Sequence, residues 1–284
     1  MKWLNINKPY LFILPSILFI CIFIGYSLFH AWSESLNNSG PLFAHYISLF
    51  NNEEVLDSLK ISLYVTITST LFSLIIGLGI TRFLFRFFKS VNWKYVVWIP
   101  MIIPHFVAAY LVFVLFSQTG VLSILLYKFN GVGLSIPLVN DNAYMGVILT
   151  YIWKEVPFVV LMLLPVYQQI DKRYEDVVRT LGGHGWQVWK TVELPWVGPV
   201  LVEVGFIIFA FIIAAYEVPA LLGVTYPKML SILAYEWFYE GNWENRPLAQ
   251  ALMITITIVM TFSSLLVIQI SRRWQSQWMK EKVK

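Results

Sequence analysis

The chain has 284 residues, of which 58% are hydrophobic and only 13% charged, and its formal net charge is +4. Soluble globular domains are nearer to half apolar and a quarter charged, and here the apolar residues form long blocks, so the composition argues against a soluble protein. The basic residues are dispersed between those blocks rather than gathered in one patch, which argues against a nucleic-acid-binding protein.

Six segments are long and apolar enough to span a membrane, because a bilayer core of about 30 Å requires a helix of about 20 residues. In chain order they are Tyr10–Trp32, Ser58–Thr81, Tyr95–Ser117, Ala143–Pro165, Val200–Leu222 and Ala249–Ser271. The first is too long for a signal peptide and lacks a small-x-small cleavage site, so we expect an uncleaved anchor. The segment "VLSILLYKF" after the third span is too short to cross and predicts an interfacial or re-entrant helix on the outer side.

Basic residues predict how the spans are oriented. Fifteen of the 20 Lys and Arg residues lie before the first span, in the loops after the second and fourth spans, or after the sixth. Cytoplasmic loops carry such an excess, so both termini and the loop between spans four and five are expected in the cytoplasm.

That fourth loop contains an unusual polar stretch, "RTLGGHGWQVWKTVELPWVGP". We expect one short helix from Asp171, its N-cap, to Leu181, a glycine-rich break, and a second helix over Trp186–Val192. Trp186 and Trp189 are three residues apart and should share a face. Pro195 and Pro199 are expected to end the element and start the next span. The tryptophans suit either the pocket of a partner protein or an aromatic belt at the lipid headgroups.

The same stretch resembles the cytoplasmic signature loop of the permease subunits of ATP-binding-cassette importers. That pattern is Glu-Ala-Ala, three residues, Gly, a variable stretch, then apolar-x-Leu-Pro and a second Pro. Here Asp176-Val177-Val178 takes the opening triplet and Gly182 the glycine, and the end of the pattern is matched by Val192, Leu194, Pro195 and Pro199. Asp replaces Glu, with Glu175 adjacent, two valines replace alanines, and Gly183 stands where Ala is usual. The resemblance covers roughly Ser58 to Ser271.

The resemblance implies an all-α, type I permease fold with six spans and both termini cytoplasmic. Residues 1–57 would be an anchor helix with the first outer loop, 58–271 the transport domain and 272–284 a basic tail. The implied setting is a bacterial inner membrane, and the implied partners are separate ATPase subunits, a second permease subunit (identical or different) and an extracellular substrate-binding protein. The residues that would couple transport to the ATPase are Glu175, Asp176, Gly182, Gly183, Trp186, Trp189, Leu194, Pro195 and Pro199.

The chain lacks the motifs of catalysis and of nucleotide or metal binding. "GVTYPK" misses the second glycine of a phosphate-binding loop. The four histidines are scattered and Cys21 is alone, so no metal-ligand spacing is present. We therefore expect no enzymatic activity, no metal and no cofactor of its own, with ATP bound by the partner ATPase subunits.

Charged residues inside the predicted spans each cost a few kcal/mol and usually face a cavity or another charge, and three of them are candidates for the substrate path. Lys154 and Glu155 lie in the fourth span and Glu217 in the fifth. They could line the substrate path, although for Lys154 we favour an ion pair with a glutamate that locks spans four and five together. Around Glu217, "YEVPALLG" is expected to break the helix at its proline and its final glycine.

Two prolines in the third span, Pro100 and Pro104, should each remove a backbone donor and kink the helix. The kink could be a hinge or gate, or a static feature of packing.

The sequence leaves open both the substrate and the driving force of transport. "EVPALLG" and "NWENRPLAQA" look similar to permeases of the polyamine, ferric iron and thiamine group, whereas sugar permeases share the general frame. An ion-coupled secondary transporter would show repeat-related broken helices, and no repeat is evident. The aromatic outer loop "YEWFYEGNWENRP" could contact a binding protein or belong to the membrane belt.

Overall fold

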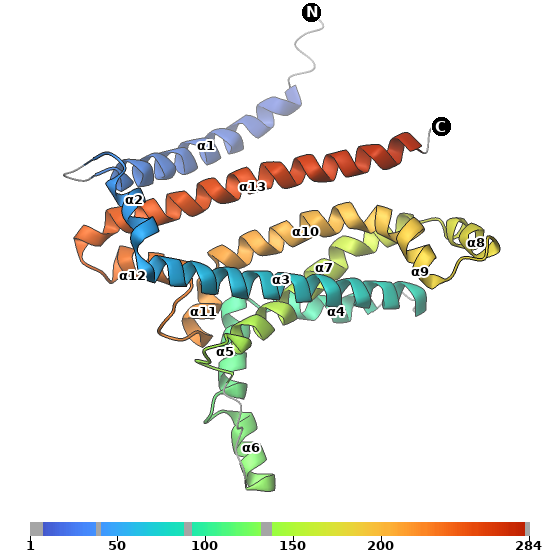
Figure 1. Cartoon of the computed structure of the whole chain (residues 1–284), viewed down its shortest axis with the longest axis horizontal. Coiled ribbons are helices and arrows are strands. Elements are labelled where there is room, and N and C mark those ends of the chain that lie inside the picture. The colour runs from blue at the N-terminus through green and yellow to red at the C-terminus, as the bar shows by residue number, and fades with distance from the viewer. Residues whose placement is uncertain (1–7, 38–40, 88–92, 132–137, 282–284) are drawn as a thin grey trace, which may run out of the picture. The chain divides into compact units, whose positions relative to one another are not determined.

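The computed structural model describes residues 8–37, 41–87, 93–131 and 138–281 (Figure 1). Lys2, Lys89, Lys282 and Lys284, which entered the orientation argument, lie outside these ranges. Among the described residues six helical stretches are long and apolar enough to cross a membrane. This confirms the predicted all-α, six-span architecture. The stretches are Phe12–Ser35, Glu53–Phe87, His105–Phe129, Met145–Gln169, Gly185–Ala214 and Trp243–Trp274.

The chain divides into two compact units, which we describe separately. Unit 1 comprises residues 1–56 and 233–259. Its elements are α1 (Lys8–Ser35), α2 (Ala44–Asn51), most of α12 (Leu230–Tyr239), the short helix η2 (Trp243–Asn245) and the start of α13 (Arg246–Glu281).

A polar cluster holds unit 1 together. Glu34 of α1 accepts a hydrogen bond from Gln250 at 3.1 Å, and Arg246 Nε lies 3.7 Å from its other oxygen. The Arg246 guanidinium also lies over the rings of Phe238 and Trp243, at 4.3 and 4.7 Å from their centroids. The aromatic segment before α13 is therefore folded around an arginine.

Unit 2 comprises residues 57–232 and 260–284 and contains the larger core. Its elements are α3 (Glu53–Phe87), α4 (Trp93–Ile102), α5 (His105–Phe116), α6 (Val121–Asn130), α7 (Met145–Gln169), α8 (Lys172–Thr180), α9 (Gly185–Val188), the π-helical turn η1 (Trp189–Glu193), α10 (Leu194–Ala214), α11 (Glu217–Leu222) and the end of α13.

The core of unit 2 lies where α10 packs along α7. Fully buried residues of the two helices, such as Tyr151, Leu163 and Ile208, meet there. Helix α3 approaches α7 closely at Gly77, where a Cβ atom would lie 2.6 Å from the Val159 side chain. Small residues at helix contacts are expected in lipid, because association there depends on close packing rather than on the hydrophobic effect.

The third predicted span, Tyr95–Ser117, is not one kinked helix. It is broken: α4 ends at Ile102, and Pro104 is the extended N-cap of α5 with ψ 149°. Pro104 lacks an N–H and disfavours helical backbone in the residue before it, so the helix stops instead of bending. The short segment "VLSILLYKF" does form a helix, α6, and the apolar stretch that includes α5 runs on to Phe129.

The expectation that Pro195 and Pro199 end the polar element and start a new span is only half right: Pro195 lies in the first turn of α10, but the polar element does not end before it. Helix runs without interruption from Gly185 to Ala214. The turn η1 is wide: the N–H of Leu194 bonds the carbonyl of Trp189, five residues back. A proline in a regular helix clashes with the carbonyl four residues earlier, and the wide turn before Pro195 relieves that clash.

The break near Glu217 lies earlier than expected. Helix α10 ends at Ala214, Ala215 is extended, and Glu217 is the first residue of α11. Pro219 therefore lies in the first turn of α11, where no intrahelical donor is required. Gly223, predicted as part of the break, is the C-cap that ends α11.

Candidate functional site at the α8–α9 loop

The segment Asp171–Glu193, called the α8–α9 loop below, begins as the sequence predicted. Asp171 caps α8 by accepting a hydrogen bond from the backbone N–H of Arg173 at 2.9 Å. The Arg173 guanidinium also donates to the same carboxylate, at 2.8 and 2.6 Å. These bonds hold the pKa of Asp171 below its usual value. A charged cap therefore fixes the start of α8.

The turn between α8 and α9 depends on two glycines. Gly182 has φ +81°, a left-handed conformation that glycine adopts without strain. The N–H of Gly183 bonds the carbonyl of Val178, and a Cβ atom on Gly183 would lie 2.6 Å from the Val178 side chain. Both positions therefore exclude larger residues, for different reasons.

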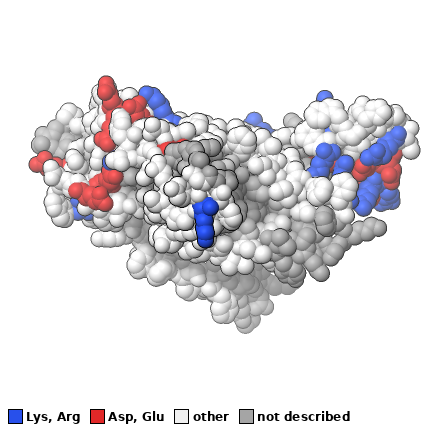
Figure 2. Space-filling model, turned by 90° about the horizontal axis from the view of Figure 1, so that it is seen from below, with Lys and Arg blue, Asp and Glu red and all other residues white. Residues whose placement is uncertain are grey.

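Trp186 and Trp189 share a face of the second helix, as the spacing predicted. Their rings stack with centroids 4.9 Å apart and planes inclined by 22°. Trp186 is 69% exposed, whereas Trp189 is half-buried, so only one of the two expected exposed tryptophans is fully available to a partner. Exposed Val177 and Leu181 add apolar surface to the loop. Figure 2 shows Lys, Arg, Asp and Glu side chains interspersed at the α8–α9 end.

The other predicted coupling residues divide into exposed and buried groups. Asp176 is exposed and Glu175 half-buried, while Pro195 and Pro199 are buried and Leu194 is half-buried. Glu175 Oε1 accepts a hydrogen bond from Arg179 at 2.7 Å, one helical turn along α8. Only the first group can meet a partner directly, whereas the second shapes the start of α10.

A cluster around Glu193 was missed by sequence reasoning. This carboxylate, 7% exposed, closes the π-helical turn, and Arg86 Nη2 donates to it at 2.8 Å. Arg82 Nη2 donates at 3.1 Å, and its Nε lies 2.8 Å from the other oxygen as an ion pair rather than a hydrogen bond. The Tyr167 hydroxyl donates at 3.1 Å. The signal that the sequence offers for this cluster is the four-residue spacing of Arg82 and Arg86, which puts both on one face of a helix.

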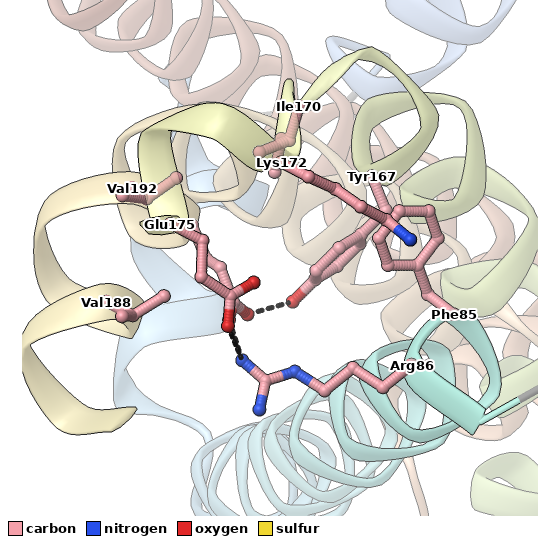
Figure 3. A pocket seen from close by; sticks show the side chains of 9 residues that line it. Phe85, Arg86, Tyr167, Ile170, Lys172, Glu175, Val188 and Val192 are labelled. Atoms are coloured by element: carbon pink, nitrogen blue, oxygen red, sulfur yellow. Dashed lines mark hydrogen bonds and ion pairs between the residues drawn. The ribbon is translucent and has the colours of Figure 1, made fainter. Parts of the chain in front are cut away.

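A pocket of about 210 Å³ lies beside this cluster (Figure 3). Arg86 from α3, Tyr167 from α7 and Glu175 from α8 converge on it. Arg86 also lies 3.8 Å from Glu175, which connects α8 to the same network. Lys172 and Glu193 also line the pocket, and apolar side chains form the rest of the wall, namely Phe85, Ile170, Val188 and Val192.

The charged residues of the fourth span contact the break in the third. Lys154 Nζ donates hydrogen bonds to the carbonyls of Pro100 and Ile103, at the end of α4. Glu155 Oε1 lies 3.1 Å from His105 Nε2, at the start of α5. The favoured ion pair between Lys154 and a glutamate is therefore wrong: the broken helix offers free carbonyls, which attract a cation.

These residues line a second pocket, of about 240 Å³, between α5, α7 and α10. His105, Lys154 and Glu155 supply its polar atoms, and its remaining lining residues are Met101, Phe158, Ile207, Ile208 and Phe211. Glu217 is not among them, and its side chain is exposed at the start of α11. The structure thus brings together two of the three predicted path residues.

Six apolar helices, charges buried within them and a polar loop between two spans define a multi-pass membrane protein of the transport class. Residues 69–281 match the family described as "Binding-protein-dependent transport system inner membrane component", and the chain belongs to this family. It is accordingly a permease of the inner membrane and not an enzyme.

Two relatives illustrate the similarity. The molybdate/tungstate transport system permease protein WtpB of Pyrococcus furiosus is 28% identical over 208 residues, 72% of this chain and 74% of its own. The sulfate transport system permease protein CysT of Escherichia coli is 26% identical over 189 residues, covering 66% and 65% of the two chains. Neither supports the preference for a polyamine, iron or thiamine solute.

Solved structures confirm the fold. A chain of the bacterial alginate ABC transporter, in complex with a periplasmic protein that binds alginate pentasaccharide, matches with a TM-score of 0.78 and 22% identity, over 96% of this chain and 98% of its own. A chain of the MetNI methionine ABC transporter in an inward-facing conformation matches with a TM-score of 0.55 and 16% identity, over 78% and 95%.

Proposed function

We propose that the α8–α9 loop is the site where a separate ATPase subunit binds this importer permease. The observation that carries the proposal is the stacked Trp186–Trp189 pair on a capped and charged loop. Large aromatic side chains dominate protein interfaces, and surrounding charges fix orientation. A lipid-belt role fits α8 less well, because none of its residues is buried and five of its nine residues are charged.

The full assembly that we propose contains two ATPase subunits, a second permease subunit, identical or different, and an extracellular substrate-binding protein. In this arrangement ATP is bound by the ATPase subunits, and this chain needs no cofactor of its own. The family description names a binding-protein-dependent system, and the alginate relative was solved with its periplasmic protein.

Docking is tested by co-purification with a co-expressed ATPase subunit. We expect the double variant Trp186→Ala/Trp189→Ala to lose the ATPase while its thermal unfolding stays close to that of the wild type. Trp243→Ala is the matched control, because this tryptophan is 80% exposed but belongs to unit 1. Normal recovery of the ATPase with the double variant would contradict the proposal.

The proposal also requires the loop to face the cytoplasm. In a Cys21→Ser background, a cysteine replacing exposed Val177 should react with a membrane-impermeant maleimide only after the cells are opened. A cysteine replacing Tyr239, 68% exposed, should react in intact cells. Labelling of the Val177 position from outside would exclude docking of a cytoplasmic ATPase.

We propose an inorganic oxyanion as the solute. The support is that the two relatives described above, which cover 72% and 66% of the chain, are named for molybdate/tungstate and for sulfate. Uptake of labelled molybdate or sulfate should be competed by the other oxyanions. Competition by spermidine, ferric iron or thiamine would return the assignment to the cationic group, and competition by an oligosaccharide would favour a sugar permease. Uptake that stops with an ionophore while ATP is maintained would indicate an ion-coupled secondary transporter.

We further propose that the solute passes the pocket at His105, Lys154 and Glu155, and that the break at Pro104 with Pro100 acts as its hinge. Glu217, the first residue of α11, does not line this pocket and stays a predicted residue of the solute path. Phe211→Ala, which enlarges the pocket, should change the KM of uptake without lowering the yield of folded permease. Phe262→Ala, at a 65% exposed position on α13, serves as the control. Equal KM values for the two variants would contradict this path.

A further inference from the structure

We propose that Glu193 is a positioning residue that makes the α8–α9 loop, the end of α3 and the start of α10 move as one body. The inference rests on the proposed function, because the docked ATPase supplies the force that moves the loop. It adds the contacts through which movement of the loop reaches the membrane spans. The supporting contacts all lie within unit 2.

Several helices meet at one buried carboxylate. Glu193 belongs to the turn η1, Arg82 and Arg86 to α3, and Tyr167 to the end of α7. Arg86 continues the network to Glu175, and Glu175 to Arg179, both on α8. Alternating charges thus connect the loop to three spanning helices.

The buried charge makes this cluster difficult to break. A carboxylate that is 93% buried cannot be left without donors, because an unpaired buried charge is strongly destabilising. The two arginines are only about one third exposed, so they too are partly withdrawn from water. Separating α3 from η1 would break several charge-assisted bonds at once, and the elements therefore tend to move together.

The cluster also lies at a point of the helix where bending is common. Glu193 ends a π-helical turn and stands two residues before Pro195, and both features are common sites of helix bending. Without a brace, a push on α9 would bend the helix at this turn and leave α10 unmoved. The Glu193 bonds to α3 lie at this weak point, where they resist the bend.

The experiment uses the transporter reconstituted with its ATPase in lipid nanodiscs, in a Cys21→Ser background. Spin labels replace Val177 on α8 and Phe87 at the end of α3, both exposed. We expect one narrow distance distribution in the wild type, the same in the absence of nucleotide and with a non-hydrolysable ATP analogue. In Glu193→Gln, which keeps the size of the side chain, the distribution should broaden or shift with nucleotide.

A functional measurement accompanies the distances. Glu193→Gln should lower the amount of solute transported per ATP hydrolysed by about tenfold, the loss expected for one charge-assisted bond, while ATP hydrolysis continues. Glu203→Gln is the matched control, because Glu203 lies on α10, which follows η1 directly, but accepts a hydrogen bond from Ser271 instead of from α3. Glu193→Asp, which keeps the charge, should recover part of the coupling. A merely structural role would lower yield and hydrolysis together.

Unchanged distances and an unchanged transport-to-ATP ratio in Glu193→Gln would overturn the inference. If that variant does not fold, Arg86→Gln removes the link to α8 at a position that is 34% exposed, and the same two outcomes apply. Failure of the proposed docking can be distinguished from failure of this inference. If docking fails, the wild-type permease would not co-purify with the ATPase. The width of the spin-label distance distribution, measured in the permease alone, would still report on the Glu193 bonds.

Discussion

Replacement of Lys154 tests how the broken third span is stabilised. Lys154 is 4% exposed, and its ammonium group donates to the two carbonyls at the end of α4. Lys154→Met fills nearly the same volume but leaves both carbonyls without this donor.

The magnitude follows from two bonds to a charged group. Such bonds are worth about 1.5–3 kcal/mol each in soluble proteins, whereas hydrogen bonds between membrane helices average about 0.6 kcal/mol. Loss of both bonds should therefore lower the free energy of unfolding by between about 1 and 6 kcal/mol. Because the site is buried within the protein, we expect a decrease of about 3 kcal/mol.

The assay is reversible unfolding of the permease in mixed detergent micelles, followed by tryptophan fluorescence. Lys60→Met is the matched control, because the Lys60 side chain is 76% exposed and pairs with Asp57 one turn away. Exposed pairs of this kind contribute about 0.3–0.5 kcal/mol. Lys154→Arg keeps the donors and should retain part of the stability.

Two results would refute the reasoning. The first is a Lys154→Met variant as stable as Lys60→Met. The second is recovery of stability in the double variant Lys154→Met/Glu155→Met, because rescue by removing the acid would mean that the ion pair, and not the capping of carbonyls, is the main role of Lys154.

Three further predictions concern backbone positions. Gly77→Ala should lower the free energy of unfolding by about 1–3 kcal/mol, because its Cβ would lie 2.6 Å from Val159. Gly79→Ala on the same helix is the control: its Cβ meets nothing within 4 Å, so it should be neutral or slightly stabilising. Equal effects of the two variants in the same unfolding assay would contradict the packing of α3 against α7. Gly182→Ala should strain the left-handed turn by about 1–2 kcal/mol and speed amide exchange across the α8–α9 loop, while Gly185→Ala, with open space and no positive φ, should not. The protection of the α8 amides, that is the intrinsic exchange rate of an unfolded chain relative to their observed rate at the same pH, should fall as the pH drops below about 4, the ordinary pKa of an aspartate. The lowered pKa of Asp171 means that its cap is fully present above that range and is lost as the folded carboxylate takes up a proton. Asp171→Asn should remove this loss of protection, and a loss that persists in the variant would assign it to another group.

The amino-acid sequence by itself determined the class of the protein and the place of its loop. Six apolar stretches of spanning length, the glycines of the loop, the Asp171 cap and the shared face of Trp186 and Trp189 all follow from short-range spacing. These are properties of neighbouring residues, because the length of an apolar run and the period of a helix are fixed locally.

Only the tertiary structure decided where the buried charges go. Lys154 finds carbonyls 51 and 54 positions away, and Glu193 finds arginines 107 and 111 positions away. Both choices depend on which helix ends: the break after Ile102 exposes carbonyls that a cation can cap, and the wide turn before Pro195 places Glu193 against α3. A charge inside a membrane takes whichever polar group packing brings within reach, and sequence spacing does not contain that distance.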